Sequence, residues 1–154
     1  MSWRDMEDHR PDRIRFPFWD QLEGRNAFGA PFQAPGPRPT SSHGTWFRYD
    51  VAPLLPDGSW HPLAVLAMCD TMPGAMFEKL GPDVEDWYGP SADFTVHPMG
   101  VARSEWLLAH STARWAGDGY ASLDITVWDP TEGLVAYATQ VMYFTFPDFR
   151  EPLQ

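Results

Sequence analysis

Cysteine and lysine are nearly missing from this sequence of 154 residues. Cys69 is the only cysteine and Lys79 the only lysine. A single cysteine excludes an intrachain disulfide, and no group of histidines, cysteines and acids has the spacing of a zinc site. We therefore expect no bound metal. We expect Cys69 to be a small core residue rather than a reactive thiol.

Positive charge of any kind is also scarce. Eleven lysine and arginine residues stand against 21 acidic ones, so the formal net charge is −10. Nucleic acid requires a basic surface, and this composition excludes it as a partner. The sequence also lacks an apolar stretch that could cross a bilayer and the apolar core of a secretory signal. A cytoplasmic protein without a membrane partner is the default expectation.

Apolar residues make up 44% of the sequence and aromatic residues 15%, enough for one domain with a substantial core. We expect this domain to cover residues 16–146. Residues 1–15 carry charges of both signs without periodicity and are predicted to be a flexible leader, and residues 147–154 a partly ordered tail. The proline-rich stretch 29–44 is predicted to be a long loop over the surface.

The stretch His61–Leu80 is apolar almost all the way round at helical spacing. Such a helix is normally enclosed on every side, so we predict a buried central helix, interrupted at Pro73 and Gly74. Asp70 falls in the middle of its Leu63 and Leu66 face. A charged residue at that place requires an explanation.

The rest of the sequence is typical of strands. Residues 16–28 and 45–51 form two candidates before the helix, and residues 91–97, 105–115, 120–129 and 134–146 form four after it. Strict alternation predicts that Ala121, Leu123, Ile125 and Val127 face the core. We expect the last four strands to follow one another as an antiparallel meander. A long antiparallel sheet curled around one helix is an α+β architecture, and it would enclose the apolar helix.

Two polar residues lie on faces that should be apolar. Asp70 either caps a restart of the helix or sits in a partly dry pocket, where a carboxylate can orient or activate a water molecule. Gln140 lies on the strand face that carries Ala136, Ala138 and Met142. A buried amide must be hydrogen-bonded, so Gln140 either bonds a neighbouring backbone group or points into a cavity.

Ser91 opens the first strand after the helix. Strict alternation places it on the same face as Asp93 and Thr95, opposite Phe94. No GxSxG motif surrounds it, and no base stands at a useful spacing, so a serine nucleophile with a catalytic triad is not indicated. By itself Ser91 is an ordinary residue at the start of a strand.

Four runs of sequence are similar to those of a known family. HPLAVLAMCD, PSADFTVH, EWLLAHSTARWAGDGYASLDITVWD and LVAYATQVMYF resemble the C-terminal half of the TesB-like, or type II, acyl-CoA thioesterases over roughly residues 45–146. The resemblance implies a hotdog fold, which is a curled antiparallel sheet around a long central helix. The periodicity independently favours that architecture. Family members carry two such units, and this sequence is long enough for a single hotdog unit.

The resemblance also implies a site and a reaction. The family's proposed catalytic set is similar in position to Asp70, Ser91 and Gln140, with Asp93 as the neighbouring candidate if the register differs by one residue. These side chains would hold a water molecule for direct attack on a thioester carbonyl. Coenzyme A would enter only as part of the substrate, and no cofactor is expected. Residues expected to contact the acyl chain are Met68, Met72, Phe77 and Met142.

Two features of the sequence bear on partners. A single hotdog unit leaves a sheet edge exposed, so we expect a homodimer or a higher even-numbered oligomer. The acidic composition disfavours an anionic nucleotide unless Arg48, Arg103 or Arg114 gather at the entrance of the site. Otherwise a carrier-protein thioester is a suitable substrate.

Two other functions remain open. The chain could be a non-hydrolytic hotdog module that binds acyl or polyketide groups. It could also be a dehydratase or isomerase on the same fold, which would require a histidine beside the acid. His61, at the entrance of the predicted helix, is the candidate for that role.

Overall fold

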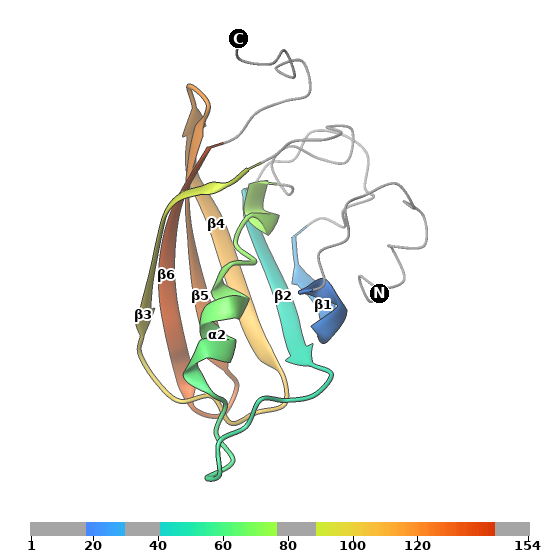
Figure 1. Ribbon diagram of the computed structural model, residues 1–154. Coiled ribbons are helices and arrows are strands. Elements are labelled where there is room, and N and C mark those ends of the chain that lie inside the picture. Colours follow the sequence, from blue (N-terminus) through green and yellow to red (C-terminus); the bar gives the residue numbers. More distant parts are fainter. Residues whose placement is uncertain (1–17, 30–40, 77–88, 144–154) are drawn as a thin grey trace.

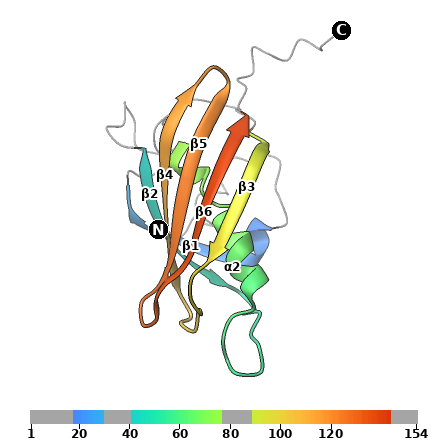
Figure 2. The same cartoon turned by 90° about the vertical axis from the view of Figure 1, so that its left-hand side faces the viewer.

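The computed structural model describes residues 18–29, 41–76 and 89–143. A short 3₁₀ helix, η1, precedes six strands and one α-helix, α2. All six strands belong to one antiparallel sheet that curls around α2 (Figures 1 and 2), which confirms the predicted α+β architecture. The predicted leader and tail lie outside the described residues. The elements are η1 (Trp19–Gln21), β1 (Leu22–Phe28), β2 (Ser42–Tyr49), α2 (Pro62–Cys69), β3 (Ser91–Pro98), β4 (Leu107–Gly117), β5 (Tyr120–Asp129) and β6 (Gly133–Tyr143).

The strand order is β1-β2-β4-β5-β6-β3. The predicted meander is correct for β4, β5 and β6 but wrong for β3, which pairs with β6 at the far edge of the sheet. The connection from β3 to β4 crosses the end of the sheet, where the N–H groups of Met99 and Gly100 donate to the Val135 carbonyl at 2.8 and 3.0 Å. This connection is longer than a hairpin turn, so it does not constrain β3 to pair with β4.

Helix α2 is shorter and less enclosed than predicted. It ends at Cys69, residues 70–73 form turns, residues 74–76 are helical again, and residues 77–80 lie outside the described part. Pro73 has no N–H to continue a helix, which explains the interruption. Leu63 and Leu66 are 65% and 41% exposed, so the prediction of burial on every side is wrong. In the described part of the chain, no helix is long and apolar enough to cross a membrane.

The core lies between α2 with its following turn and the concave face of the sheet. Small side chains cover much of the sheet face, and methionines from the helix and turn fill the space above them. The predicted inward face of β5 is confirmed, since all four of its residues are at most 1% exposed. The buried alanines of the described strands are Ala109, Ala121, Ala136 and Ala138, and the buried methionines are Met68, Met72, Met76 and Met142.

The second strand begins earlier than predicted, because Ser42, His43 and Gly44 belong to β2 and not to the loop predicted over residues 29–44. Gly44 has a specific reason for lacking a side chain. A Cβ atom there would lie 2.2 Å from Cε1 of Phe28, whose ring crosses Gly44 and contacts His110 edge-on, with the ring centroids 4.9 Å apart.

We expect Gly44→Ala to displace the Phe28 ring and lower the free energy of unfolding by about 1–2 kcal/mol. Urea denaturation of Gly44→Ala, Phe28→Ala and the double variant measures this coupling. In the Phe28→Ala background the Gly44 substitution should have little effect. An equal effect in both backgrounds would mean that the two residues do not interact.

Candidate active site

Asp70 is the C-terminal cap of α2. Its backbone N–H donates to the Ala67 carbonyl at 3.2 Å, and its carboxylate faces β6. There Oδ1 accepts a hydrogen bond from Nε2 of Gln140, with 3.2 Å between the two atoms. The residue still has one side open to solvent. The acid is therefore held by the protein but remains accessible to a small molecule.

Gln140 is the buried centre of the site, at 2% exposure on the inner face of β6. Its Nε2 donates to Asp70 and also to Oγ of Ser91, at 2.5 Å. One amide thus connects the helix end to the start of β3. Its Oε1 is buried and has no hydrogen-bond partner among the described residues. That oxygen is available to accept a hydrogen bond from a bound molecule, since a buried acceptor is costly to leave unpaired.

Ser91 reaches this amide because β3 is irregular at its first residues. Ser91 pairs with Met142 and Asp93 pairs with Val141. A step of two residues along β3 therefore corresponds to a step of only one residue along β6. Ala92 is therefore the extra residue of a β-bulge, a feature that often re-aims a side chain next to an active site. The bulge turns Ser91 to the inner face, and strict alternation had placed it wrongly on the outer one.

Asp93 points away from this group. Its carboxylate accepts long hydrogen bonds from the Thr95 hydroxyl, at 3.4 Å, on the exposed side of the edge strand. The structure therefore brings together Asp70, Ser91 and Gln140, and leaves out the neighbouring candidate. Sequence reasoning named all three, but it had no signal for the bulge.

The acid at this site is harder to ionise than an ordinary aspartate. Partial burial disfavours its charge and raises the pKa of Asp70, and the hydrogen bond from Gln140 opposes that rise. Burial, together with the Asp70 charge, also raises the pKa of the adjacent Cys69 to about 12. Cys69 is fully buried, as predicted for a core residue, and it is not a thiolate nucleophile at neutral pH.

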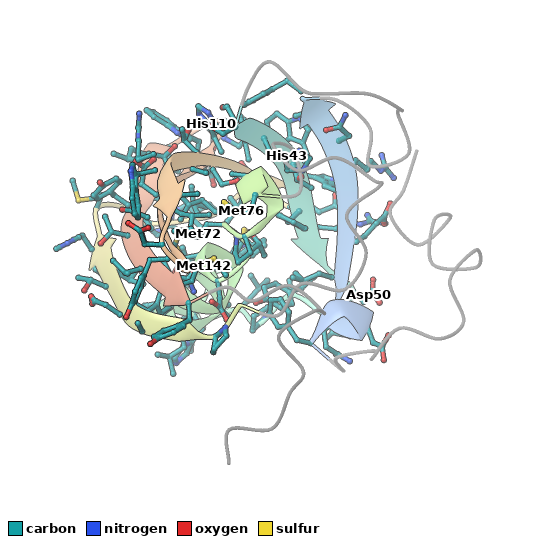
Figure 3. All side chains as sticks on the ribbon, turned by 90° about the horizontal axis from the view of Figure 1, so that it is seen from above. His43, Asp50, Met72, Met76, His110 and Met142 are labelled. Atoms are coloured by element: carbon teal, nitrogen blue, oxygen red, sulfur yellow. The ribbon has the colours of Figure 1, made fainter. Side chains whose placement is uncertain are left out.

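The predicted acyl-chain contacts are core residues in this structure. Met68, Met72 and Met142 are at most 1% exposed, and Figure 3 shows Met72 and Met142 inside the curl of the sheet. Phe77 lies outside the described residues. A role for these side chains in binding an acyl chain stays a prediction, and it requires the methionines to move.

His61 does not stand beside the acid. It is the N-terminal cap of α2, where its Nδ1 accepts the Leu63 N–H at 3.2 Å, at the opposite end of the helix from Asp70. Sequence reasoning missed His43, which is 8% exposed on the inner face of β2 and lies 2.7 Å from the Thr45 hydroxyl through Nε2. The alternation of His43, Thr45 and Phe47 could have revealed it. Within the described residues, no group of histidine, cysteine and acidic side chains could hold a metal ion.

The three arginines that could receive an anionic substrate do not gather at this site. Arg48 is paired with Glu23 and Glu105, Arg103 with Asp57 and Glu132, and Arg114 with Asp124. Each guanidinium is thus neutralised by carboxylates in a different part of the sheet or its connections. The sequence analysis required these arginines to gather at the entrance of the site if an anionic nucleotide is to bind there. These three residues do not do so.

Three solved structures share this architecture. A protein with hot dog fold from Alicyclobacillus acidocaldarius is 24% identical, with a TM-score of 0.67 over 87% of this chain and 49% of its own. Acyl-CoA thioesterase II TesB2 from Mycobacterium marinum is 25% identical, with a TM-score of 0.65 over 89% and 54%. A hypothetical thioesterase from Streptococcus pneumoniae, solved with coenzyme A, is 12% identical, with a TM-score of 0.59 over 80% and 86%.

These similarities confirm the hotdog fold. The chain spans about half the length of the first two structures, and the described residues form one hotdog unit. No protein of curated function matches the sequence. A family model described as the acyl-CoA thioesterase C-terminal domain matches residues 2–144. The chain therefore belongs to the acyl-CoA thioesterase C-terminal domain family.

Proposed function

We propose that this protein hydrolyses acyl-CoA or a related acyl thioester by direct attack of water. The observation that carries the proposal is the single amide of Gln140, which holds the Asp70 carboxylate and the Ser91 hydroxyl on either side of it. An acid with a raised pKa beside two fixed polar groups is typical of a general base that positions a water molecule.

In this mechanism each group has one task. The Asp70 carboxylate accepts a proton as the water oxygen bonds to the thioester carbonyl carbon. Gln140 keeps the carboxylate in place, and its Oε1, which has no partner within the described residues, accepts the second hydrogen of the water. When the tetrahedral intermediate collapses, the carbon–sulfur bond breaks and the leaving thiolate takes the proton from Asp70. The products are a carboxylic acid and a free thiol.

Ser91 fits a positioning role better than a nucleophilic one. Its hydroxyl oxygen accepts a hydrogen bond from the Gln140 amide, and an amide N–H cannot remove a proton from Oγ. The hydroxyl hydrogen of Ser91 is then free to donate to the substrate. We expect no acyl-enzyme on this residue.

The first test is release of thiol from a panel of short, long and aromatic acyl-CoA thioesters, followed by intact mass measurement during turnover. We expect hydrolysis without an acylated protein species, and Ser91→Ala should retain a reduced rate. Accumulation of acyl-protein that disappears in Ser91→Ala would replace water attack by covalent catalysis. Binding of the panel without any thiol release would favour the non-hydrolytic acyl-binding module.

The thiol half of the substrate is the less defined part. A fold neighbour was solved with coenzyme A and another is an acyl-CoA thioesterase, which supports acyl-CoA as the substrate. The net charge of −10 opposes the approach of the anionic nucleotide. We propose that the acyl chain enters between the sheet and α2 with its following turn, beside Met68, Met72 and Met142. The expected contact with Phe77 concerns a residue outside the described part of the chain.

We expect kcat/KM for an acyl-CoA to rise several-fold as ionic strength increases, because salt screens repulsion between the acidic protein and the nucleotide. The matched acyl-pantetheine lacks the nucleotide, so its kcat/KM should change little. Parallel assays from low to high salt measure the difference. A fall in kcat/KM for the acyl-CoA alone would instead reveal a cation site for the nucleotide.

A second copy of the chain is the proposed partner. The helix face that carries Asp70 also exposes Leu63 and Leu66, and β3 is an edge strand with one side unpaired within the described sheet. An open edge and an exposed apolar helix face are features that a second hotdog unit would cover. The homodimer stays a prediction.

A further inference from the structure

A second polar group lies inside the curl of the sheet, on strands β2 and β4, which β5 separates from Gln140 on β6. His43, Thr45 and Ser111 are 8%, 9% and 3% exposed on the inner faces of β2 and β4. Oγ1 of Thr45 lies 2.7 Å from Nε2 of His43, and the Ser111 hydroxyl donates to the His43 carbonyl at 3.4 Å. The residues beside them on this face are alanine, phenylalanine and leucine. Burial of three polar side chains in such a layer has a free-energy cost that apolar residues would avoid.

The turn that begins at Asp70 connects this group to the catalytic one. Asp70 contacts Gln140 on β6, and four residues later a Cβ atom on Gly74 would lie 3.3 Å from Cδ2 of His43 on β2. The same short segment therefore covers both polar groups. β2 and β6 are separated by three interstrand spacings, or roughly 14 Å. That is a suitable length for an acyl chain with one end at each group.

The layer between the two groups is made of adaptable side chains. Met72 comes from the turn, Met76 from the helical residues after it and Met142 from β6. Figure 3 shows Met72 and Met76 between Met142 and His43. Methionine is unbranched and repacks more readily than leucine or isoleucine. The sheet below them carries Ala121 and Ala138, which leave room when a methionine side chain rotates away.

We propose that His43, Thr45 and Ser111 form a hydrogen-bonding subsite at the distal end of the acyl pocket. The subsite takes acyl groups that carry a hydroxyl or carbonyl group near the end remote from the thioester. The inference rests on the proposed thioester hydrolysis and narrows its substrate class. An unsubstituted chain of the same length cannot hydrogen-bond to these side chains, so the subsite favours the chain that carries the polar group.

Thiol release from two series of thioesters tests the subsite, one with plain acyl chains and one with terminal hydroxyl groups, matched in length. For the wild type we expect kcat/KM to be about tenfold higher for the hydroxylated chain of the best length, the effect of one good hydrogen bond. Thr45→Val keeps the shape of the side chain and should lower kcat/KM for the hydroxylated series about tenfold more than for the plain series, which removes that preference. Ser111→Ala should weaken the preference in the same direction.

Thr112→Val is the matched control, because Thr112 is next to Ser111 on β4 but pairs with Ser42 on the other face of the sheet. This variant should keep the preference. Equal rates for the two series in the wild type, or an equal loss on both series in Thr45→Val, would make the cluster a structural element and overturn the subsite.

A binding measurement separates failure of the subsite from failure of the proposed reaction. The melting temperature of Asp70→Asn should rise more with hydroxylated than with plain thioesters. If the wild type cleaves neither series but its melting temperature rises more with the hydroxylated thioesters, the proposed hydrolysis is wrong and the subsite stands. If neither series is cleaved and the two shift the melting temperature equally, both inferences are wrong.

Discussion

Replacement of Asp70 by asparagine should lower kcat for thioester hydrolysis by about two to four orders of magnitude, the usual contribution of a general base. Asparagine has the same size, and its side-chain oxygen can still accept the hydrogen bond from Nε2 of Gln140, but it cannot take a proton from water. The fold should remain intact, because Asp70 ends α2 through its backbone N–H. KM should change much less than kcat, since the acid acts in the transition state.

The same substitution should raise the stability of the protein at neutral pH. Burial raises the pKa of Asp70 in the folded state, so the charged carboxylate is less favourable there than in the unfolded chain. The loss in free energy of unfolding is absent below the ordinary pKa of aspartate and grows as the pH rises through the folded-state pKa of Asp70. Asp70→Asn removes this loss, because asparagine carries no charge. The rate of hydrolysis has the opposite pH dependence and should increase as Asp70 ionises. Because the pKa of Asp70 is raised, this increase should occur at a higher pH than for an ordinary aspartate.

Two aspartates serve as matched controls for Asp70→Asn. Asp118 lies in the exposed turn between β4 and β5 with φ of 50°, a conformation that asparagine tolerates well. Asp93 carries its carboxylate on the exposed side of β3. Asp118→Asn and Asp93→Asn should both retain activity. Full activity in Asp70→Asn, or its loss in Asp93→Asn, would show that the site is assigned to the wrong acid.

Asp129→Asn should have the largest effect on stability, a loss of about 3 kcal/mol or more in the free energy of unfolding. Asp129 is 2% exposed at the end of β5, and its two oxygens accept six hydrogen bonds at 2.7 to 3.1 Å. Four of the donors are backbone N–H groups, from Arg103, Ser104, Thr131 and Glu132. An asparagine NH₂ group would face N–H donors on one side, and a buried donor without an acceptor is costly.

This network ties the β3–β4 connection to the β5–β6 turn. Asp129→Asn should lower Tm by roughly 10 °C, measured by thermal denaturation. The variant should also unfold at a lower urea concentration than the wild type. Asp118→Asn is again the control, because the same chemical change at an exposed turn should leave Tm unaltered. If both variants melted like the wild type, the carboxylate of Asp129 would not support the fold.

The contribution of Asp129 should depend on pH in a defined direction. Its burial disfavours the charge, but the N–H groups of Ser104 and Arg103 and the Ser104 hydroxyl outweigh burial and hold the pKa of Asp129 well below its ordinary value of 3.8. For an acid with a lowered pKa, the stabilisation is complete above the ordinary pKa and is lost as the pH falls toward the folded-state pKa. The stability gap between wild type and Asp129→Asn should therefore narrow below about pH 4.

The sequence by itself determined what depends on local pattern. Alternation along residues 120–129 identified the buried face of β5. Pro73 indicated that the helix is interrupted, since proline cannot continue the hydrogen-bond ladder, but α2 already ends at Cys69. The place of Gln140 among inward residues of β6 also followed from the two-residue period of a strand. The resemblance to a thioesterase family singled out Asp70, Ser91 and Gln140, and the structure brings these three side chains together. Their catalytic role stays a prediction.

Only the tertiary structure decided how those residues meet. The pairing of β3 with β6 is a contact between segments far apart in the chain, and no local pattern encodes which edge a strand joins. The bulge at Ala92 exists only relative to the partner strand, and it turns Ser91 toward Gln140 against the strict alternation of its own strand. The exposed Leu63 and Leu66 were likewise unpredictable, because an apolar residue does not specify what covers it.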